Sequence, residues 1–396
     1  MSVLFTPQKI GIMEIRNRFV HSATYECMAA DDGQVTDALI KRYTRIAKGG
    51  TGLIIPGYLF VMPNGRAALR QTGIHDDGMI EGLKSLVDAV HGKGSRIVFQ
   101  LMHSGRQTTK EVIGQTPLSP SKGVMDTIYL TRPGEMNENH IRSVIRAFGA
   151  AARRAEEAGA DGVQVHAAHG YLVNQFLSPF FNKRTDSWGG SPENRFRFLK
   201  EIILEIKKNV SDDFPVMVKL NTRDFTPKEG ITPDLARTYA TWLADLSIDG
   251  LEVSCGTICY SMFQMCRGDV PTREMVHTFP WWKKITGKIM FKTLEGKFDL
   301  DEGYNVEAAK VIKPVIGDIP LLVVGGLRKV PHMETVIQNG WADFISMSRP
   351  FIKQPHIVNR IKEGKAHDVT CVSCNRCLAA VANLMPLQCY EKGFPK

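Results

Sequence analysis

Two histidines three residues apart are followed by a glycine and a tyrosine in the stretch VHAAHGY, residues 165–171. The stretch begins like a buried strand and then presents His166, His169 and Tyr171, whose side chains can donate hydrogen bonds or protons. They could be packed polar residues with local partners, because a histidine on a strand is more often a satisfied core residue. They could instead form a cluster that contacts a substrate.

A second candidate group is the C-terminal stretch CVSCNRCLAAVANLMPLQC, residues 371–389. It places Cys371, Cys374, Cys377 and Cys389 in a C-x2-C-x2-C-x11-C pattern. Four thiolates so close in sequence could hold a [4Fe–4S] cluster or a zinc ion, or could remain empty thiols. The closely spaced first three favour iron–sulfur, because zinc sites usually come as two well-separated pairs. Since no secretory signal opens the chain, metal or redox chemistry is favoured over a disulfide framework.

Eight short apolar runs, rich in β-branched residues and bounded by turns, must position these groups. They lack strict alternation of apolar and polar residues, which suits parallel strands covered on both faces. The runs are residues 18–23, 52–59, 96–102, 162–168, 216–221, 250–256, 321–326 and 344–349.

Helical patterns with identifiable caps lie between most of these runs. Thr36, Ser191 and Thr232 each precede one such pattern, and the longest pattern ends at Gly159. Eight strand–helix units in series, with no Gly-rich dinucleotide motif after the first strand, predict an α/β fold of the (β/α)8 TIM barrel type. We expect the barrel to span residues 1–365 and a Cys-rich C-terminal extension to span residues 366–396.

Two connections, 103–136 after the third strand and 257–304 after the sixth, are longer than the barrel requires. Both leave the C-terminal ends of strands, where barrel enzymes place loops over their active sites. The second contains Met262, Met265, Trp281 and Trp282, and we expect a lid or pocket wall. A contact between copies in a homo-oligomer is the alternative.

The C-terminal ends of the predicted strands meet at one rim of the barrel. Gly325 and Gly326 leave backbone N–H groups open to a phosphate, and Arg349 can form paired hydrogen bonds with its oxygens. This is the usual place for a phosphate site in a barrel. Gln100 and Lys219 would then face the aromatic ring system that the phosphate anchors, and a lysine beside a flavin would stabilise the reduced ring as an anion.

The stretch VHAAHGYLVNQFLSPFFNKRTDSWGGSPENRFRF resembles the signature of the old yellow enzyme family of FMN-dependent ene-reductases. The resemblance continues in LFTPQKIGIMEIRNRFVHSA, IVFQLMHSGR, TPLSPS and ADFISMSRPFI, and spans roughly residues 4–355. The branch it points to has a barrel like the N-terminal halves of 2,4-dienoyl-CoA reductase and trimethylamine dehydrogenase. The cysteine stretch also resembles the cluster segment that follows the barrel in those two relatives.

The resemblance implies a barrel that binds FMN. Backbone groups of Ala23, Thr24 and Tyr58 would line the flavin, with Tyr25 near its reactive edge. Gln100 would bond the pyrimidine edge and Lys219 would lie by the N1/O2 side. The residues implied for the phosphate are Gly325, Gly326, Ser348 and Arg349.

The resemblance also assigns roles to the opening cluster. His166 and His169 would donate to a substrate carbonyl oxygen, and Tyr171 would be the proton donor. Hydride addition to the β-carbon of an activated alkene builds negative charge on that oxygen, which two fixed donors stabilise. The substrate would be an enone, an enoate or an enoyl thioester. The chain departs from the family at Tyr25, Lys219 and Ser348, which leaves the redox potential and the substrate open.

Electrons would come from NAD(P)H at the barrel mouth or from an electron-transfer protein acting through the cysteine segment, because the chain has no G-x-G-x-x-G motif. Two alternatives remain. One is oxidative N-demethylation of a small amine, which an aromatic bowl and acidic groups at the mouth would favour. The other is an electron-transfer flavin/iron–sulfur subunit of a larger complex.

Charge and apolar composition limit the classes of partner that the chain is expected to bind. The 396 residues carry a net charge of +9, but lysine and arginine are scattered among acidic residues with no long basic run. We therefore expect no nucleic-acid partner, while anionic small molecules fit this charge. No apolar run approaches the ~20 residues that cross a bilayer, so we expect a cytoplasmic protein with no membrane partner.

Overall fold

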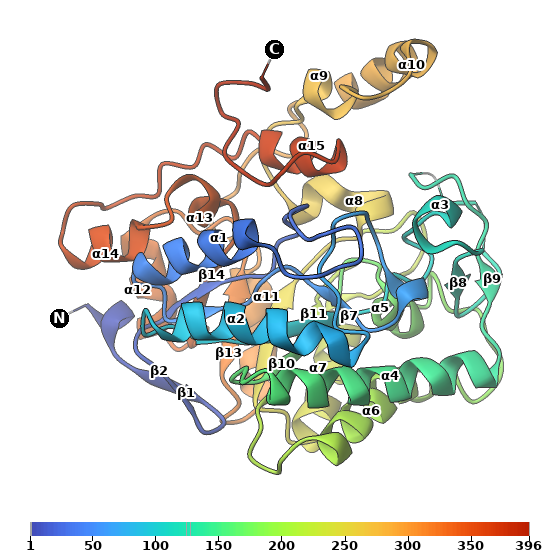
Figure 1. Cartoon of the computed structure of the whole chain (residues 1–396), viewed down its shortest axis with the longest axis horizontal. Helices are drawn as coiled ribbons and strands as arrows, with labels where there is room; N and C mark the ends of the chain where they lie inside the picture. The colour runs from blue at the N-terminus through green and yellow to red at the C-terminus, as the bar shows by residue number, and fades with distance from the viewer. Residues whose placement is uncertain (1, 124, 127, 396) are drawn as a thin grey trace.

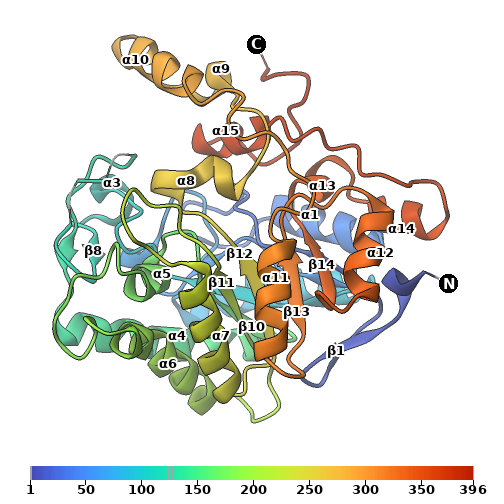
Figure 2. The ribbon, with the colours of Figure 1, turned by 180° about the vertical axis from the view of Figure 1, so that it is seen from behind.

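The structure, a computed structural model, describes residues 2–123, 125–126 and 128–395. Its elements alternate strand and helix for most of the chain, as Figures 1 and 2 show from opposite sides. The strands are β1 (Gln8–Ile10), β2 (Met13–Ile15), β3 (Phe19–His21), β4 (Leu53–Ile54), β5 (Leu59–Phe60), β6 (Arg96–Ile97), β7 (Phe99–Met102), β8 (Leu118–Ser119), β9 (Gly134–Glu135), β10 (Val163–Ala167), β11 (Val216–Asn221), β12 (Gly250–Ser254), β13 (Leu321–Val324) and β14 (Phe344–Met347).

The helices surround the central sheet and cover its mouth. They are α1 (Asp37–Lys48), α2 (Ile80–His91), α3 (Lys110–Ile113), α4 (Glu138–Glu157), α5 (Leu172–Leu177), α6 (Pro192–Asn209), α7 (Pro233–Asp245), α8 (Ile258–Met265), α9 (Thr272–Met275), α10 (Trp281–Lys292), α11 (Val306–Ile312), α12 (Val330–Gln338), α13 (Arg349–Lys353), α14 (Ile357–Lys362) and α15 (Arg376–Ala382).

The central sheet closes into a barrel of parallel strands. Its order is β5-β7-β10-β11-β12-β13-β14-β3-β4-β6, and every pair in it is parallel. Strands β6 and β7 are two parts of one run, separated only by Val98, whose N–H donates to the Ile54 carbonyl at 3.0 Å. The strand β7 near one end of the sheet order and β6 at the other end therefore belong to the same run, which closes the sheet. The predicted (β/α)8 barrel is confirmed, and each of the eight predicted runs contains a strand.

The predicted helix starts are formed by capping side chains. Thr36, Ser191 and Thr232 each accept a hydrogen bond from a backbone N–H in the first turn, at the starts of α1, α6 and α7. Asn137 caps α4 in a capping box with His140. Local sequence therefore sets where the outer helices begin.

The hairpin β1–β2 closes the end of the barrel at which the strands begin. Ile10, Met13 and Ile15 are buried in one apolar cluster with Val20 and Phe344, which belong to the barrel strands. This hairpin leaves the opposite end, where the strands finish, for the long connections. Residues 103–137 contain α3, β8 and β9, and residues 255–305 contain α8, α9 and α10.

The C-terminal segment folds back over the barrel mouth. Asn375, in the left-handed conformation just before α15, donates to the carbonyl oxygens of Cys266 and Asp269 in the second long connection, at 2.7 and 2.9 Å. Arg376 forms an ion pair with Glu274 of α9 at 2.9 Å. The division of the chain at residues 365 and 366 stays a prediction. No helix in the described part of the chain is long and apolar enough to cross a bilayer.

Candidate functional site

A cavity of about 390 Å³ lies where the barrel strands end. Ile258, Met262, Met265 and Cys266 of the second long connection form part of its wall, as the length of that connection predicts. The predicted site residues that line it are Ala23, Thr24, Tyr25, Tyr58, His169, Tyr171, Lys219, Gly325, Gly326, Ser348 and Arg349. The structure thus brings together residues that are more than 300 positions apart in the sequence.

Two predicted residues, Gln100 and His166, lie behind the cavity lining. Gln100 is fully buried, and its side-chain nitrogen donates to the Gln164 side chain at 2.6 Å, while its Oε1 has no partner. The His166 ring lies edge-on to His169, with centroids 5.1 Å apart, and its Nδ1 has no partner. Their roles stay predictions.

Lys219 reaches the cavity from β11 and pairs with a buried carboxylate. Its Nζ lies 3.2 Å from Oε2 of Glu252 and donates to Oγ of Ser22 at 2.8 Å. Ser22 in turn donates to Oε1 of Glu252 at 2.7 Å. Lys219 and Glu252 are directly opposite in the β11–β12 register. Opposite charges inside two buried strands are a signal from which this pair could have been predicted.

His169 is held in an unusual backbone conformation at the mouth. Its φ of 63° lies in the left-handed region, which non-glycine residues seldom adopt. Its N–H donates to the Asn221 side chain at 3.2 Å, and its carbonyl accepts from Gln107 at 3.0 Å. Nε2 lies 2.7 Å from Oγ of Ser254. Burial, and then the charge of Lys219, hold the pKa of His169 well below its ordinary value, so the ring is neutral.

Three tyrosines form a connected group on one side of the cavity. The Tyr171 hydroxyl donates to the Tyr58 hydroxyl at 2.9 Å, and the Tyr58 ring stacks on Tyr25 with centroids 6.1 Å apart. Burial and the neighbouring Tyr58 raise the pKa of Tyr171 well above its ordinary value. Tyr171 therefore keeps its proton at neutral pH.

Gly325 and Gly326 directly follow β13 in backbone conformations with positive φ, 151° and 72°. A Cβ on Gly326 would overlap the Asp301 carbonyl, so the second long connection passes directly over this turn. Arg328, two residues later, also lines the cavity and has a buried Nε without a partner. Sequence reasoning missed Arg328, although its place beside the glycine pair was a usable signal.

Arg349 lies between the large cavity and the C-terminal segment. Its Nη1 donates to the Arg267 carbonyl at 2.9 Å and to Oδ1 of Asn375 at 2.6 Å. It lines both the large cavity and the smaller one described next. Its guanidinium therefore also ties the cysteine-rich segment to the barrel.

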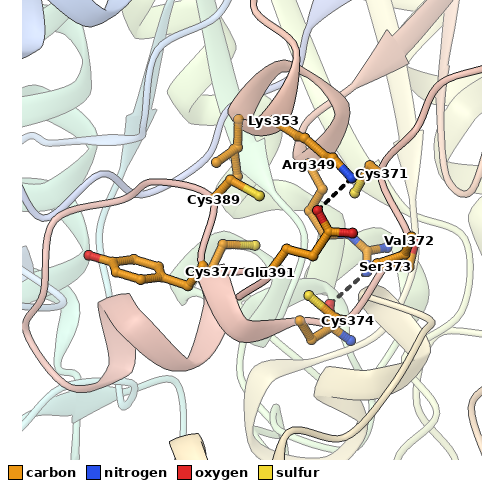
Figure 3. A pocket seen from close by; sticks show the side chains of 12 residues that line it. Arg349, Lys353, Cys371, Val372, Ser373, Cys374, Cys377, Cys389 and Glu391 are labelled. Carbon is orange, nitrogen blue, oxygen red and sulfur yellow. Dashed lines mark hydrogen bonds and ion pairs between the residues drawn. The ribbon is translucent and has the colours of Figure 1, made fainter. Parts of the chain in front are cut away.

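The four C-terminal cysteines line one small cavity of about 20 Å³ (Figure 3). Cys371, Cys374, Cys377 and Cys389 surround it, and an ion pair between Lys353 and Glu391, 2.6 Å long, lies at its edge. Burial raises the pKa of Cys377 to about 12. In the described part of the chain, no three His, Cys, Asp or Glu side chains are arranged to hold a metal ion.

Comparisons with known proteins agree on one family. Residues 3–275 match the NADH:flavin oxidoreductase / NADH oxidase family. The chain is 35% identical to an NADH oxidase of Thermoanaerobacter brockii over 94% of its own length and 52% of that protein. It is 33% identical to an NADPH dehydrogenase of Clostridium acetobutylicum, over 90% of its own length and 93% of that protein.

Among solved structures, a 2-naphthoyl-CoA reductase in complex with 2-naphthoyl-CoA superposes with a TM-score of 0.85 at 27% identity. The match covers 98% of this chain and 56% of that chain. The chain thus spans about half the length of this reductase and of the NADH oxidase, and nearly the whole length of the NADPH dehydrogenase.

Proposed function

Because the chain belongs to the NADH:flavin oxidoreductase / NADH oxidase family and is thus a flavin-dependent oxidoreductase, we propose that it reduces the C=C bond of α,β-unsaturated carbonyl compounds. The observation that carries the proposal is the shared cavity: His169 and Tyr171 line the same space as Lys219, Gly325, Gly326 and Arg349. Hydrogen-bond donors for a substrate oxygen and groups suited to a phosphorylated flavin lie together there.

The residues present fit FMN, the flavin of this family. Ser346 and Arg328 line the cavity, and each has a buried polar atom, Oγ and Nε, with no partner in the described structure. Such atoms are rare unless a bound group satisfies them. Backbone groups at Gly325 and Gly326 and the cations Arg328 and Arg349 would hold the phosphate. Gln100 and Lys219 would hold the ring system.

Bound FMN would supply a hydride from N5 of its reduced ring to the β-carbon of the alkene. The chain itself stabilises the charge that develops on the carbonyl oxygen. His169 is neutral and would donate through its single N–H. His166, whose pKa is also held well below the ordinary value by burial and by His169, would be the second donor. Losing one donor of this kind costs about 3–4 kcal/mol in the transition state.

Tyr171 would deliver the proton to the α-carbon. Its raised pKa keeps the phenol protonated, and the Tyr58 hydroxyl at 2.9 Å is the neighbour from which it could regain the proton. Most of the surrounding wall is apolar, with Ala67, Ile128 and Ile258 among its members. Such a wall suits an apolar enone, enoate or acyl thioester and keeps water from the reacting atoms.

We propose that the cysteine cavity holds a [4Fe–4S] cluster. All four thiols line one cavity, and the close C-x2-C-x2-C spacing of the first three favours a cluster over zinc. Electrons would reach the protein from NAD(P)H or from a carrier protein. Purified protein that contains neither iron nor zinc would remove both metal assignments.

One feature favours a second candidate, the oxidation of a small amine. Five tyrosines line the cavity, namely Tyr25, Tyr58, Tyr129, Tyr171 and Tyr304, and aromatic faces attract organic cations. However, the lining also includes Lys219, Arg328 and Arg349, and no carboxylate lines the described cavity. The positive charge of the cavity lining favours a substrate that develops negative charge during the reaction over a cationic amine.

The test is to purify the protein anaerobically, reduce its flavin and follow reoxidation by cyclohexenone and an enoyl-CoA. Small amines are added separately to protein with oxidised flavin. Rapid reoxidation by the enone or the enoyl-CoA, and none by saturated ketones, is expected. If no activated alkene reoxidises the flavin, the proposal is wrong. Reduction of the oxidised flavin by an amine would favour the second candidate.

A further inference from the structure

Helix α10 carries an apolar face that the rest of the described protein leaves uncovered. Trp281, Ile285 and Ile289 follow one another at four-residue intervals, which places them on one side of the helix. Their exposed fractions are 79%, 63% and 61%, and Trp282 beside them is 57% exposed. Single exposed apolar side chains are ordinary, but a stripe of four large ones marks a contact surface.

The opposite side of α10 is fixed to the protein. Gly287 and Phe291 are buried, and Phe291 belongs to one apolar cluster with Ala379 of α15. Just before α10, the Thr278 N–H and hydroxyl donate to the Asn383 side chain at 2.9 and 2.6 Å. The exposed stripe therefore belongs to a helix that is anchored to the cysteine-rich segment.

All the charged side chains of α10 are positive. Its four ionisable side chains are Lys283, Lys284, Lys288 and Lys292, and the sequence WWKKITGKIMFK contains no acid. The Lys283 ammonium lies over the Trp282 ring, 4.8 Å from its centre. Two copies of the chain that met face to face here would bring lysines against lysines, which is unfavourable. A partner with acidic residues around an apolar surface would be complementary.

The position of α10 near the cysteine-rich segment indicates the class of acidic partner that would bind it. Figures 1 and 2 show α9 and α10 beyond α15, at the end of the molecule away from the β1–β2 hairpin. The helix α15 carries Cys377, and Arg376 beside it is paired with Glu274 of α9. A protein seated on α10 would therefore lie next to the cysteine-lined cavity.

We propose that α10 is the docking surface for a small acidic electron-carrier protein of the ferredoxin or flavodoxin class. The inference rests on the proposed function, because it takes the cysteine cavity as the place where such a carrier is needed. The Trp281 and Ile285 side chains would enter the apolar centre of the contact, and the lysines would face its acidic rim. Such interfaces associate fast at low salt and weaken as salt rises.

The experiment measures binding of the full-length protein to a purified acidic ferredoxin and a purified acidic flavodoxin, by biolayer interferometry at low and high salt. We expect at least one carrier to bind, with an affinity that falls as salt rises. Replacing Trp281 with Ser should weaken binding about thirty-fold, the effect of losing a central aromatic contact. Replacing the four lysines with Gln should slow association by roughly ten-fold or more.

Two matched control variants test whether the loss of binding is specific to α10. Ile12→Ser removes an apolar side chain that is 65% exposed at the opposite end of the barrel, and Lys93→Gln removes a distant exposed charge. Neither should change carrier binding. Retained flavin and an unchanged circular dichroism spectrum show that each variant is folded.

Failure to bind either carrier at low salt would overturn the proposal, and so would equal binding by the α10 variants. A wild-type dimer that the Trp281 variant dissociates would instead assign the surface to a second copy. Binding to phosphatidylglycerol vesicles, without carrier binding, would assign it to lipid. The binding measurement needs no turnover, so a failure of alkene reduction with intact carrier binding would count against the proposed function alone.

Discussion

Lys219→Met is expected to destabilise the protein because it leaves Glu252 charged and unpaired inside the barrel. The two side chains are 2% and 0% exposed, and their charged atoms lie 3.2 Å apart. Two unit charges at that distance interact by about 5 kcal/mol at an effective dielectric constant near 20. Glu252 would keep hydrogen bonds from Ser22 at 2.7 Å and Gln164 at 3.0 Å, so the expected loss is nearer ~3 kcal/mol.

The double variant Lys219→Met/Glu252→Gln separates this pairing from the role of Lys219 in the cavity. Removing both charges should restore most of the lost stability, to within about 1 kcal/mol of the wild type, with a coupling energy of at least ~2 kcal/mol. Because the double variant still lacks the lysine that lines the cavity, it should bind FMN more weakly than the wild type.

The assay is urea-induced unfolding of the flavin-free wild type, Lys219→Met, Glu252→Gln and the double variant, followed by circular dichroism, together with fluorescence titration of each with FMN. Lys93→Met is the control, because this lysine is exposed, and its effect should stay within about 0.5 kcal/mol. If Lys219→Met and the double variant are equally destabilised, the ion pair with Glu252 does not account for the stabilising effect of Lys219. Wild-type FMN affinity in the double variant would refute the cavity role.

Further predictions concern the neighbouring groups. His169→Ala should weaken phenol binding and slow alkene reduction by 10²–10³ while flavin stays bound, and an unchanged phenol affinity would refute the donor role. Tyr171→Phe should slow turnover by about 10²–10⁴ and leave hydride transfer to the alkene, measured by stopped-flow flavin reoxidation, much less affected. Burial lowers the pKa of His103 to about 3, so the folded state resists its protonation. This residue should contribute a loss of stability of about 1.4 kcal/mol per pH unit as pH drops from 6.5 toward 3, and His103→Gln should reduce the slope measured by urea unfolding by that amount, leaving the share of other buried histidines such as His21. Cys377→Ser should lower iron and acid-labile sulfide content and the ~400 nm shoulder, and iron content equal to the wild type would exclude this cysteine as a ligand.

The sequence predicts the barrel well because its signals are local. Buried β-branched runs and side-chain caps such as Thr36 and Ser191 depend on a few neighbouring residues, and all eight strands are found where expected. The β1–β2 hairpin and β5 were not predicted, because strands of two or three residues carry too little pattern. The break of the third strand at Val98 has no local signal either.

The site is predicted less completely, because its remaining parts depend on contacts between distant segments. Arg349 was expected to hold a phosphate, but its contacts with Asn375 exist only because the C-terminal segment folds back over the barrel mouth. The Glu252 partner of Lys219 follows from strand register, which a buried acid in the run 250–256 could have suggested. Trp281 and Trp282 lie on the exposed α10, away from the cavity wall that Met262 and Met265 form.

The cofactor content of the purified protein is the most direct measurement of the central claim, that the cavity at the ends of the barrel strands binds FMN. Protein isolated without added flavin, or reconstituted with riboflavin 5′-phosphate, should be yellow and release a stoichiometric amount of FMN on denaturation. Protein that stays colourless after incubation with excess riboflavin 5′-phosphate, while folded by circular dichroism, would contradict the account.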